Sequence, residues 1–503
     1  MAQKTVQARR RRVVPEKLSF FRYGRIGDRM VVTNDAAEWH LLTEADFELF
    51  LAGELTAEHP EHAALLQKGF LRDDLDLDGL ADRVRRKKAH VGQGPHLHIV
   101  LSTLRCNQSC AYCHASRAGL QDVLTDMTLE TAKRVVDLAM QTTSPYVNFE
   151  FQGGEPTLNM EVVKFVVEYS REKNRFEGKE LNHSIVTNLT RMSEEIADWL
   201  VDSDVMVCAS LDGPEELHNW NRAWRGEGAG NAYAETIRWM DYINQRYVDQ
   251  GREPTLWHVD ALMTTTRKTF DHWKEVIDLY VERGLPSIHL RPLNPYGFAV
   301  PTWKTIGYAA DEYLAFYERC LDYILELNRQ GVELIEGTAA VLLAKMLTPD
   351  DPNFTDILSP CGAGTGQVAY NYDGRIFTCD EARMTDAMGD DRFQIGDVRD
   401  SSYTQVVRHP TVKAMAIASL QDSLPQCDTC WNKPFCGVCP MHNYMTGGEL
   451  FGQRPNSSKC AEYMTISRLL LERLGSDSDG STEEIFRRWT IRKRRPMARD
   501  CAV

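Results

Sequence analysis

The sequence has no long apolar run: nothing in its 503 residues approaches the roughly 20 apolar residues of a membrane-spanning helix. It also lacks a secretory signal, because its N-terminus is basic and polar and has no apolar segment before a cleavage site. Positive charge is in deficit too, and the net charge of −14 disfavours a nucleic-acid binder, which presents a basic face to phosphates. We therefore expect a cytoplasmic protein that binds neither membrane nor nucleic acid.

Basic residues do cluster near both ends. One cluster is Arg9–Arg12, and a second is formed by Arg487, Arg488, Arg492, Lys493, Arg494 and Arg495. We predict a disordered basic segment at 1–16 and a flexible basic tail at 473–503, where "GSDSDGSTEE" is typical of a linker. Both clusters are interpreted as solvated tails, and the alternative is that they dock an acidic partner.

Cysteine, in contrast, is plentiful. Thirteen cysteines are many for a cytosolic chain, in which disulfides rarely persist. Three lie at 106–113 and seven between 361 and 460, whereas Cys208, Cys320 and Cys501 stand alone as buried or incidental thiols. Clustered thiols in a reducing compartment indicate metal sites.

Strand-like and helix-like segments alternate in the middle of the chain. The strands are expected at 97–102, 146–151, 183–187, 204–211, 256–263 and 287–291, and the helices at 128–141, 160–174, 193–202, 232–247 and 268–283. This order predicts an α/β fold in which right-handed βαβ units form a parallel sheet, curled into an open or closed barrel. Ligands of such folds bind at the C-terminal strand ends, and the three-cysteine loop directly follows the first strand.

The remaining segments divide the chain into further units. A small N-terminal α+β unit is expected at 17–92, with a hairpin turn at Asn34-Asp35 and a helix from Thr43. The barrel at 93–303 is followed by a helical linker at 304–358 and then by the second cysteine-rich domain at 359–472.

The first cysteine group, Cys106, Cys110 and Cys113, fits a soft metal, either zinc or an iron–sulfur cluster. Structural zinc needs a fourth ligand, and His114, adjacent to Cys113, is poorly placed to complete the same tetrahedron. Three ligands on a four-iron cluster leave one iron open, which is what a reactive metal site requires. Structural zinc stays as the alternative.

With Tyr112 before the third cysteine, this spacing resembles the Cys-x3-Cys-x-aromatic-Cys signature of the radical S-adenosylmethionine (SAM) superfamily. The resemblance implies a partial (β/α)6 barrel and a 4Fe-4S cluster held by Cys106, Cys110 and Cys113. It also implies that the open iron binds the amino and carboxylate groups of SAM. Reductive cleavage of SAM then gives methionine and a 5′-deoxyadenosyl radical that removes a hydrogen from the substrate.

A glycine pair follows the second predicted strand in "FEFQGGEPTLN". Glycines let a ligand approach the backbone, and a carboxylate can pair with an ammonium group, although an ordinary turn is the alternative. By resemblance, Gly153, Gly154 and Glu155 match the motif that holds the SAM amino group. The family also places SAM contacts on later strand ends, with loop capping as the alternative; the candidates are Asn188, Ser210 and Arg222.

The second cysteine field begins with Cys361 and Cys379, which flank a predicted hairpin at Asp373-Gly374 and can therefore converge on one site. A tighter group, Cys427-x2-Cys430-x5-Cys436-x2-Cys439, and then Cys460 follow. A zinc ribbon separates its two pairs by about 15–20 residues, which disfavours zinc here.

This seven-cysteine order resembles the SPASM extension of peptide-modifying radical SAM enzymes, although the family separates its third and fourth tight cysteines by three residues. The resemblance implies two auxiliary iron–sulfur clusters. The first would be held by Cys361, Cys379 and Cys439, with its fourth position either open or capped by a non-cysteine ligand, and the second by Cys427, Cys430, Cys436 and Cys460. Asp380 matches an aspartate that acts as a base in sulfatase-maturing relatives, and a surface aspartate is the alternative.

The segments "FRYGRIGDRMVVTNDAAEWHLL", "FQGGEP", "ALMTTTR" and "LRPLNPYGFAV" are similar to the His-Xaa-Ser system radical SAM maturase. That similarity implies a ribosomally made precursor peptide with His-Xaa-Ser repeats and a second radical SAM protein as partners. A reducing protein such as flavodoxin or ferredoxin is the expected electron donor. The N-terminal unit resembles the winged-helix element that binds leader peptides, and a purely structural extension of the barrel is the alternative.

Three other functions stay open. A SPASM enzyme could oxidise a residue of a folded protein, as in sulfatase maturation, or a radical enzyme could act on RNA, which the acidic charge disfavours. A zinc-stabilised peptide-binding scaffold is the non-enzymatic alternative. The sequence leaves the product open between a crosslink, an epimer and an oxidation.

Overall fold

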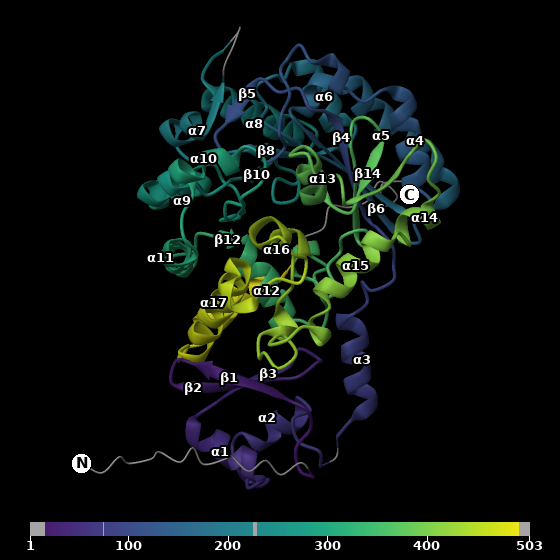
Figure 1. Cartoon of the computed structure of the whole chain (residues 1–503). Coiled ribbons are helices and arrows are strands. Elements are labelled where there is room, and N and C mark those ends of the chain that lie inside the picture. The colour runs from purple at the N-terminus through teal and green to yellow at the C-terminus, as the bar shows by residue number, and fades with distance from the viewer. Residues whose placement is uncertain (1–15, 74, 225–228, 492–503) are drawn as a thin grey trace, which may run out of the picture.

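The computed structural model describes residues 16–73, 75–224 and 229–491, so residues 1–15 of the predicted N-terminal segment and residues 492–503 of the predicted basic tail lie outside the described residues. Figure 1 shows a small N-terminal unit at the bottom, an α/β barrel at the top, and the cysteine-rich part between them. Within the described ranges, no helix is both long and apolar enough to cross a membrane.

Five parallel strands form the barrel wall in the order β10-β8-β7-β6-β4. The predicted alternation of strands and helices is confirmed for this part, and Thr128 and Ser193 cap two of its helices. The elements are β4 (Leu97–Thr103), α4 (Leu129–Ala139), β6 (Tyr146–Gly153), α5 (Met160–Glu177), β7 (Glu180–Thr187), α6 (Glu194–Asp202), β8 (Met206–Ser210), α7 (Glu215–Asn221), α8 (Ala232–Asp249), β10 (Asp260–Leu262) and α9 (Trp273–Glu282).

The sixth predicted strand differs from expectation. β11 (Ser287–Ile288) pairs with β12 (Ile335–Glu336) and not with β10 of the barrel sheet. β11 is only two residues long, and the chain after it contains Pro292 and Pro295, which cannot donate backbone hydrogen bonds to a ladder. The chain after β11 therefore leaves the sheet and reaches the first cysteine loop, where the Phe298 N–H donates to the Cys113 carbonyl oxygen.

The cysteine-rich part extends the barrel sheet beyond β4. Strand β13 (Gln367–Tyr370) runs parallel to β4, with Gln367 opposite Leu97, and β14 (Arg375–Phe377) and β15 (Gln394–Asp397) follow antiparallel. The predicted hairpin at Asp373-Gly374 joins β13 to β14. Because β4 leads into the first cysteine loop, this shared sheet ties the two cysteine regions together.

Helices complete the C-terminal half. They are α10 (Ala299–Ile306), α11 (Ala310–Arg329), α12 (Gly337–Leu347), α13 (Asp380–Asp386), α14 (Tyr403–Val407), α15 (Pro410–Ser419), α16 (Pro440–Gly447), α17 (Ser458–Gly475) and α18 (Ser481–Trp489). The prediction of a flexible tail from residue 473 differs from the structure, because α17 continues to Gly475 and α18 packs on α11 and α12. Its Ile485, Phe486 and Trp489 are buried, and this short apolar face was hidden by the polar linker before it.

The N-terminal unit has an antiparallel sheet, β1 (Arg22–Ile26), β2 (Arg29–Thr33) and β3 (Trp39–Leu42), packed with helices α1 (Glu44–Ala52) and α2 (His62–Gln67). Asn34-Asp35 turns β2 into β3, and Thr43 caps α1, as predicted. Helix α3 (Leu77–Lys87) connects the unit to the barrel, and α17 lies against β1 (Figure 1).

Phe149 tests how the barrel core contributes to stability. Its side chain is 0% exposed on β6, so Phe149→Ala should lower the free energy of unfolding by about 3–5 kcal/mol through lost burial and a cavity. Phe176→Ala is the matched control, because Phe176 is 88% exposed and its loss should change stability by less than about 0.5 kcal/mol. Denaturant titration of both variants measures this, and equal effects would contradict the assigned core.

Candidate functional site

The loop that carries the first three cysteines leaves the C-terminal end of β4 and is held from two sides. Its short strand β5 (Gln108–Cys110) pairs with β9 (Arg222–Trp224), which places Cys110 opposite Arg222. The segment after β11 also meets the loop, because the Phe298 N–H donates to the Cys113 carbonyl at 2.9 Å. The loop is therefore fixed by elements far apart in the sequence.

The thiols of this loop lie close enough to affect one another. Burial raises the pKa of Cys106, and the nearby Cys110 adds to this effect. Burial raises the pKa of Cys110 to about 12, although the Arg222 guanidinium opposes the shift. Two N–H groups point at the Cys106 sulfur, from the Gln108 backbone at 3.4 Å and the Asn188 amide at 3.8 Å. Such donors suit a sulfur that carries negative charge on a metal.

Gly153 and Gly154 let the end of β6 approach the cysteine loop. A Cβ atom on Gly153, whose φ is 145°, would lie 2.0 Å from the Thr103 carbonyl oxygen, and one on Gly154 would lie 2.3 Å from that of Arg105. In this close approach the Gly154 N–H donates to Thr103 and the Glu155 N–H to Arg105. The glycines therefore fit two backbones together beside the predicted SAM site.

Glu155 is fully buried and links the ends of β6 and β7. Its carboxylate accepts from the Thr187 hydroxyl at 2.6 Å, the Thr157 hydroxyl at 2.7 Å and the Asn188 N–H at 2.8 Å. Burial raises the pKa of Glu155, and these donors oppose the shift. The geometry gives Glu155 a positioning role for Asn188, whose amide contacts Cys106.

Behind the loop, Asp212 joins Tyr112 to Arg222. Asp212 is 0% exposed, accepts from the Tyr112 hydroxyl at 2.5 Å, and forms an ion pair with Arg222 at 3.1 Å. The Arg222 guanidinium also lies over the Tyr112 ring, 5.4 Å from its centre. Tyr112 and Arg222, both predicted near the cofactor, therefore support the loop that carries Cys110 and Cys113. Ser210 lies at the C-terminal end of β8, on the same rim.

The first auxiliary group, Cys361, Cys379 and Cys439, comes together beside β4. Burial raises the pKa of Cys379, and Glu381, Cys439 and Cys361 add to the effect. Burial likewise raises the pKa of Cys361 to about 12. The His442 N–H donates to the Cys439 sulfur at 3.4 Å, so this group too has a backbone donor aimed at sulfur.

The second group lies between α12, α17 and the N-terminal unit. Burial raises the pKa of Cys436, and Cys430, Cys460 and Cys427 add to it in that order. Burial raises the pKa of Cys427 to about 11 against the effect of Arg454, and for Cys430 the opposing cation is Arg22 of the N-terminal unit. In the structure the seven cysteines lie in two neighbourhoods: Cys361, Cys379 and Cys439 in one, and Cys427, Cys430, Cys436 and Cys460 in the other.

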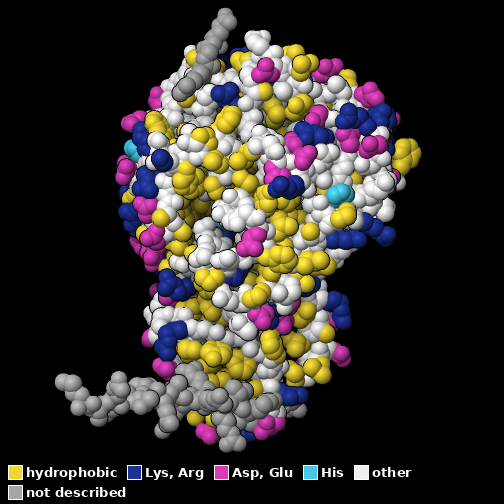
Figure 2. All heavy atoms as spheres, in the orientation of Figure 1, with side chains coloured by type: hydrophobic (Ala, Val, Ile, Leu, Met, Phe, Trp, Pro, Cys, Tyr) yellow, Lys and Arg dark blue, Asp and Glu magenta, His cyan; other side chains and the backbone are white. Residues whose placement is uncertain are grey.

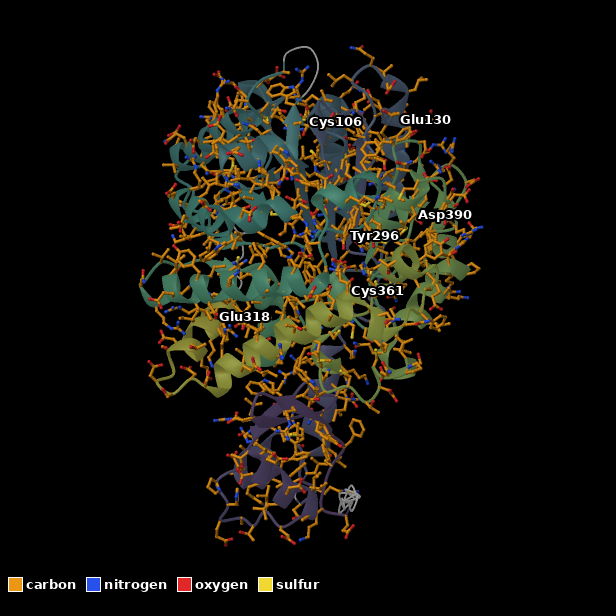
Figure 3. All side chains as sticks on the ribbon, turned by 60° about the vertical axis from the view of Figure 1, so that its left-hand side comes forward. Cys106, Glu130, Tyr296, Glu318, Cys361 and Asp390 are labelled. Atoms are coloured by element: carbon orange, nitrogen blue, oxygen red, sulfur yellow. The ribbon has the colours of Figure 1, made fainter. Side chains whose placement is uncertain are left out.

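A cavity of about 300 Å³ lies between the segment that contains β11 and the cysteine-rich domain. The loop after β11 contributes Arg291 and Tyr296, and the opposite wall includes Asp356, Glu381 and Cys439. In the view of Figure 3, Tyr296 falls between Cys106 and Cys361. The surface in Figure 2 is hollowed near the place where Figure 1 shows β12. Helix α12, which directly follows β12 in the chain, contributes residues to the lining of the cavity.

Asp380 begins helix α13 and does not line this cavity. Its carboxylate accepts from the Arg383 guanidinium at 2.9 Å, and its side chain is 11% exposed. The adjacent Glu381 faces the cavity, and burial, with Asp356 and Asp380 nearby, raises its pKa to about 7. The alternative interpretation of Asp380 as a surface aspartate is wrong, because Asp380 is a buried member of an ion pair.

His114, considered as a zinc ligand, faces away from the thiols. Its Nε2 lies 2.9 Å from the Asn294 carbonyl oxygen, and burial lowers its pKa to about 4. Within residues 16–73, 75–224 and 229–491, no three His, Cys, Asp or Glu side chains converge on a position for a single metal ion. Clustered buried thiols with N–H donors fit an iron–sulfur cluster better than a four-ligand zinc site.

Comparison with known families agrees with this geometry. Residues 100–249 match the radical SAM superfamily, and residues 361–431 match SPASM, an iron–sulfur cluster-binding domain. The chain contains a radical SAM domain and a SPASM domain. SAM and iron–sulfur clusters are the cofactors of these two domains.

Relatives of this radical SAM/SPASM protein include maturases. The cysteine-type anaerobic sulfatase-maturating enzyme of Clostridium perfringens is 24% identical over 319 residues, covering 60% of this chain and 76% of that enzyme. The structure of native anSMEcpe with bound AdoMet and Kp18Cys peptide aligns with a TM-score of 0.61 at 18% identity, covering 78% of this chain and all of that one. Streptococcus suis SuiB bound to precursor peptide SuiA aligns at 0.53 and 14% identity, covering 89% and 99%.

Some residues of the site were missed by sequence reasoning. Asn107 is 3% exposed and links Asn188 to Thr190, and its place inside the cysteine motif was the available signal. Gly297 has a φ of 52°, and a Cβ there would lie 2.6 Å from the His114 carbonyl oxygen. The segment "LRPLNPYGFAV" contacts the cysteine loop through Phe298. Sequence analysis used it only as part of the resemblance to a maturase family, because no local pattern in the sequence indicates this contact.

The buried Asp212–Arg222 pair makes a stability prediction. Arg222→Met leaves the Asp212 carboxylate buried without its cation and should lower the free energy of unfolding by about 3–5 kcal/mol. Tyr112→Phe removes one hydrogen bond and should cost about 1–3 kcal/mol. Arg246→Met removes a partly exposed pair with Asp198 and is the control, expected to have a much smaller effect because solvent screens this pair. Denaturant titration measures the free energy of unfolding of each variant. An equal loss in Arg222→Met and in the control would contradict the prediction that the buried Asp212–Arg222 pair stabilises the fold.

Proposed function

We propose that this chain is a radical SAM maturase that modifies a residue of a ribosomally synthesised precursor peptide of the His-Xaa-Ser type. The observation that carries the proposal is the cavity of about 300 Å³ between the segment that contains β11 and the Cys439 group, which has room for a side chain with its flanking backbone. Arg291 and Asp356 give the cavity polar walls of both signs, suited to a peptide segment.

In this proposal Cys106, Cys110 and Cys113 hold the 4Fe-4S cluster at which SAM is reductively cleaved to a hydrogen-abstracting radical. Gly153, Gly154 and Ser210 lie on the strand ends that would face SAM. Glu155, Asn188, Tyr112 and Arg222 act as supports: Asn188 donates toward the Cys106 sulfur, and Glu155 fixes Asn188.

The cysteine-rich domain is proposed to hold two auxiliary clusters. Cys361, Cys379 and Cys439 would bind the one beside the cavity, and Cys427, Cys430, Cys436 and Cys460 the one nearer the N-terminal unit. Asp380, oriented by Arg383, is the proposed base by its match to the aspartate of sulfatase-maturing relatives, and the adjacent Glu381 is the carboxylate that lines the cavity. A flavodoxin or ferredoxin in the cytoplasm would supply electrons, and a second radical SAM protein would act on the same peptide.

Loss of the first three thiols should end the radical chemistry. The variant Cys106→Ala, Cys110→Ala, Cys113→Ala should form no 5′-deoxyadenosine under anaerobic reducing conditions, because SAM cleavage needs that cluster. Cys320→Ala, in the apolar core of α11 and outside all three groups, should retain the activity. Chromatography of the products measures both, and undiminished cleavage in the triple variant would contradict the proposal.

The substrate class is tested by anaerobic co-expression with small open reading frames encoded nearby, read by tandem mass spectrometry. We expect a mass shift confined to one residue of a His-Xaa-Ser peptide, absent when the triple cysteine variant is used. A shift on a folded protein, as in sulfatase maturation, with every peptide unchanged would contradict the peptide assignment. The named activity of the Clostridium perfringens relative makes that the second candidate.

A further inference from the structure

We infer that the N-terminal unit forms part of the second auxiliary metal site, with Arg22 as a positioning residue that supplies a fixed positive charge. The inference rests on the proposed cluster at Cys427, Cys430, Cys436 and Cys460, and it extends that site to a strand some 400 residues earlier in the chain. In this inference the N-terminal unit contributes a side chain to a metal site, whether or not it also binds a peptide.

Arg22 lies at the start of β1 and is 6% exposed. Its Nε donates to the carbonyl oxygen of Asp428 at 2.6 Å, which lies between Cys427 and Cys430 in the sequence. An arginine buried at this point holds the Cys-x2-Cys turn through its backbone and places a permanent cation beside the thiols. A hydrogen bond from a charged donor is shorter and stronger than one between neutral groups.

Trp431, the residue after Cys430, makes a second set of contacts with the N-terminal unit. The hydroxyl of Thr33, which is 0% exposed on β2, donates to the Trp431 carbonyl oxygen at 2.8 Å. The backbone of Gly24 touches the Trp431 indole so closely that a Cβ there would lie 2.1 Å from its Cδ1. The contact therefore depends on glycine at position 24 and fixes the segment just after Cys430.

A chain of charges joins the unit to the rest of the cysteine segment. Asp35 pairs with Arg22 at 2.9 Å and with Lys433 at 3.3 Å, and Lys433 also pairs with Asp422. Lys433 lies three residues before Cys436. The contacts at 428, 431 and 433 thus follow the segment between Cys427 and Cys436 along its length.

The polar contacts of Arg22 and Thr33 lie outside the apolar core of the N-terminal unit. Its sheet and helices enclose a separate apolar core that includes Leu42, Phe47, Phe50 and Phe70, all 0% exposed. Arg22 and Thr33 instead direct polar groups out of the unit and into the cysteine segment. A nearby cation stabilises the more negative, reduced state of an iron–sulfur cluster and so raises its reduction potential.

The experiment uses the full chain, reconstituted anaerobically, and follows iron content and the potential of each cluster by electron paramagnetic resonance. Arg22→Gln should shift one auxiliary potential to more negative values and lower the iron content of that site. Arg22→Lys keeps the charge and should keep the potential closer to that of the parent. The matched control is Arg25→Gln, because Arg25 lies on the same strand, is half exposed and pairs with Glu44 of its own unit.

Cys427→Ala, Cys430→Ala identifies which signal belongs to the second site. If that variant keeps all the parent's iron and signals, the proposed cluster itself is wrong and this inference falls with it. If the double cysteine variant identifies the signal of the second site, but Arg22→Gln and Arg25→Gln give that site the same reduction potential and iron content, the inference alone is overturned. Should Arg22→Gln fail to fold, Thr33→Val decides: loss of iron from the second site alone supports the inference, and unchanged iron and potential overturn it.

Discussion

Ten cysteine thiols gather in three groups, four of them buried and six partly buried, and this removal of thiols from water is the constraint on which the structure depends. A thiolate in an apolar interior is unstable unless a cation compensates it, and the raised pKa of Cys106, Cys379 and Cys436 reflects that cost. Iron bound to the thiolates would remove this cost, and metal binding would then be coupled to the stability of these segments.

The pairing of β13 with β4 explains how the three groups share one framework. β4 ends at the cysteine loop of the radical SAM domain, while β13 begins the hairpin between Cys361 and Cys379. One ladder thus sets the distance between the first cluster site and the first auxiliary site, with the cavity and Tyr296 between them. The N-terminal unit contacts the segment from Cys427 to Cys436 through Arg22 and Thr33. These contacts connect the N-terminal unit to the cysteine-rich domain.

Sequence reasoning predicted what depends on local spacing, namely the strand and helix alternation and the hairpin at Asp373-Gly374. It did not predict contacts between distant segments, because Arg22 with Asp428 and Asp212 with Tyr112 leave no periodic pattern. β11 was placed in the barrel because apolar residues mark a strand without naming its partner. Helix α18 was missed because its apolar face is only three residues within charged sequence.

The central claim is that the Cys106, Cys110 and Cys113 site leaves one iron open for SAM. Hyperfine spectroscopy of the reduced protein with isotope-labelled SAM tests it most directly. The account predicts coupling between the cluster spin and the labelled amino nitrogen, lost when Cys110 is replaced by Ala. A cluster spectrum that ignores added SAM, or a colourless protein with zinc at these thiols, would contradict it.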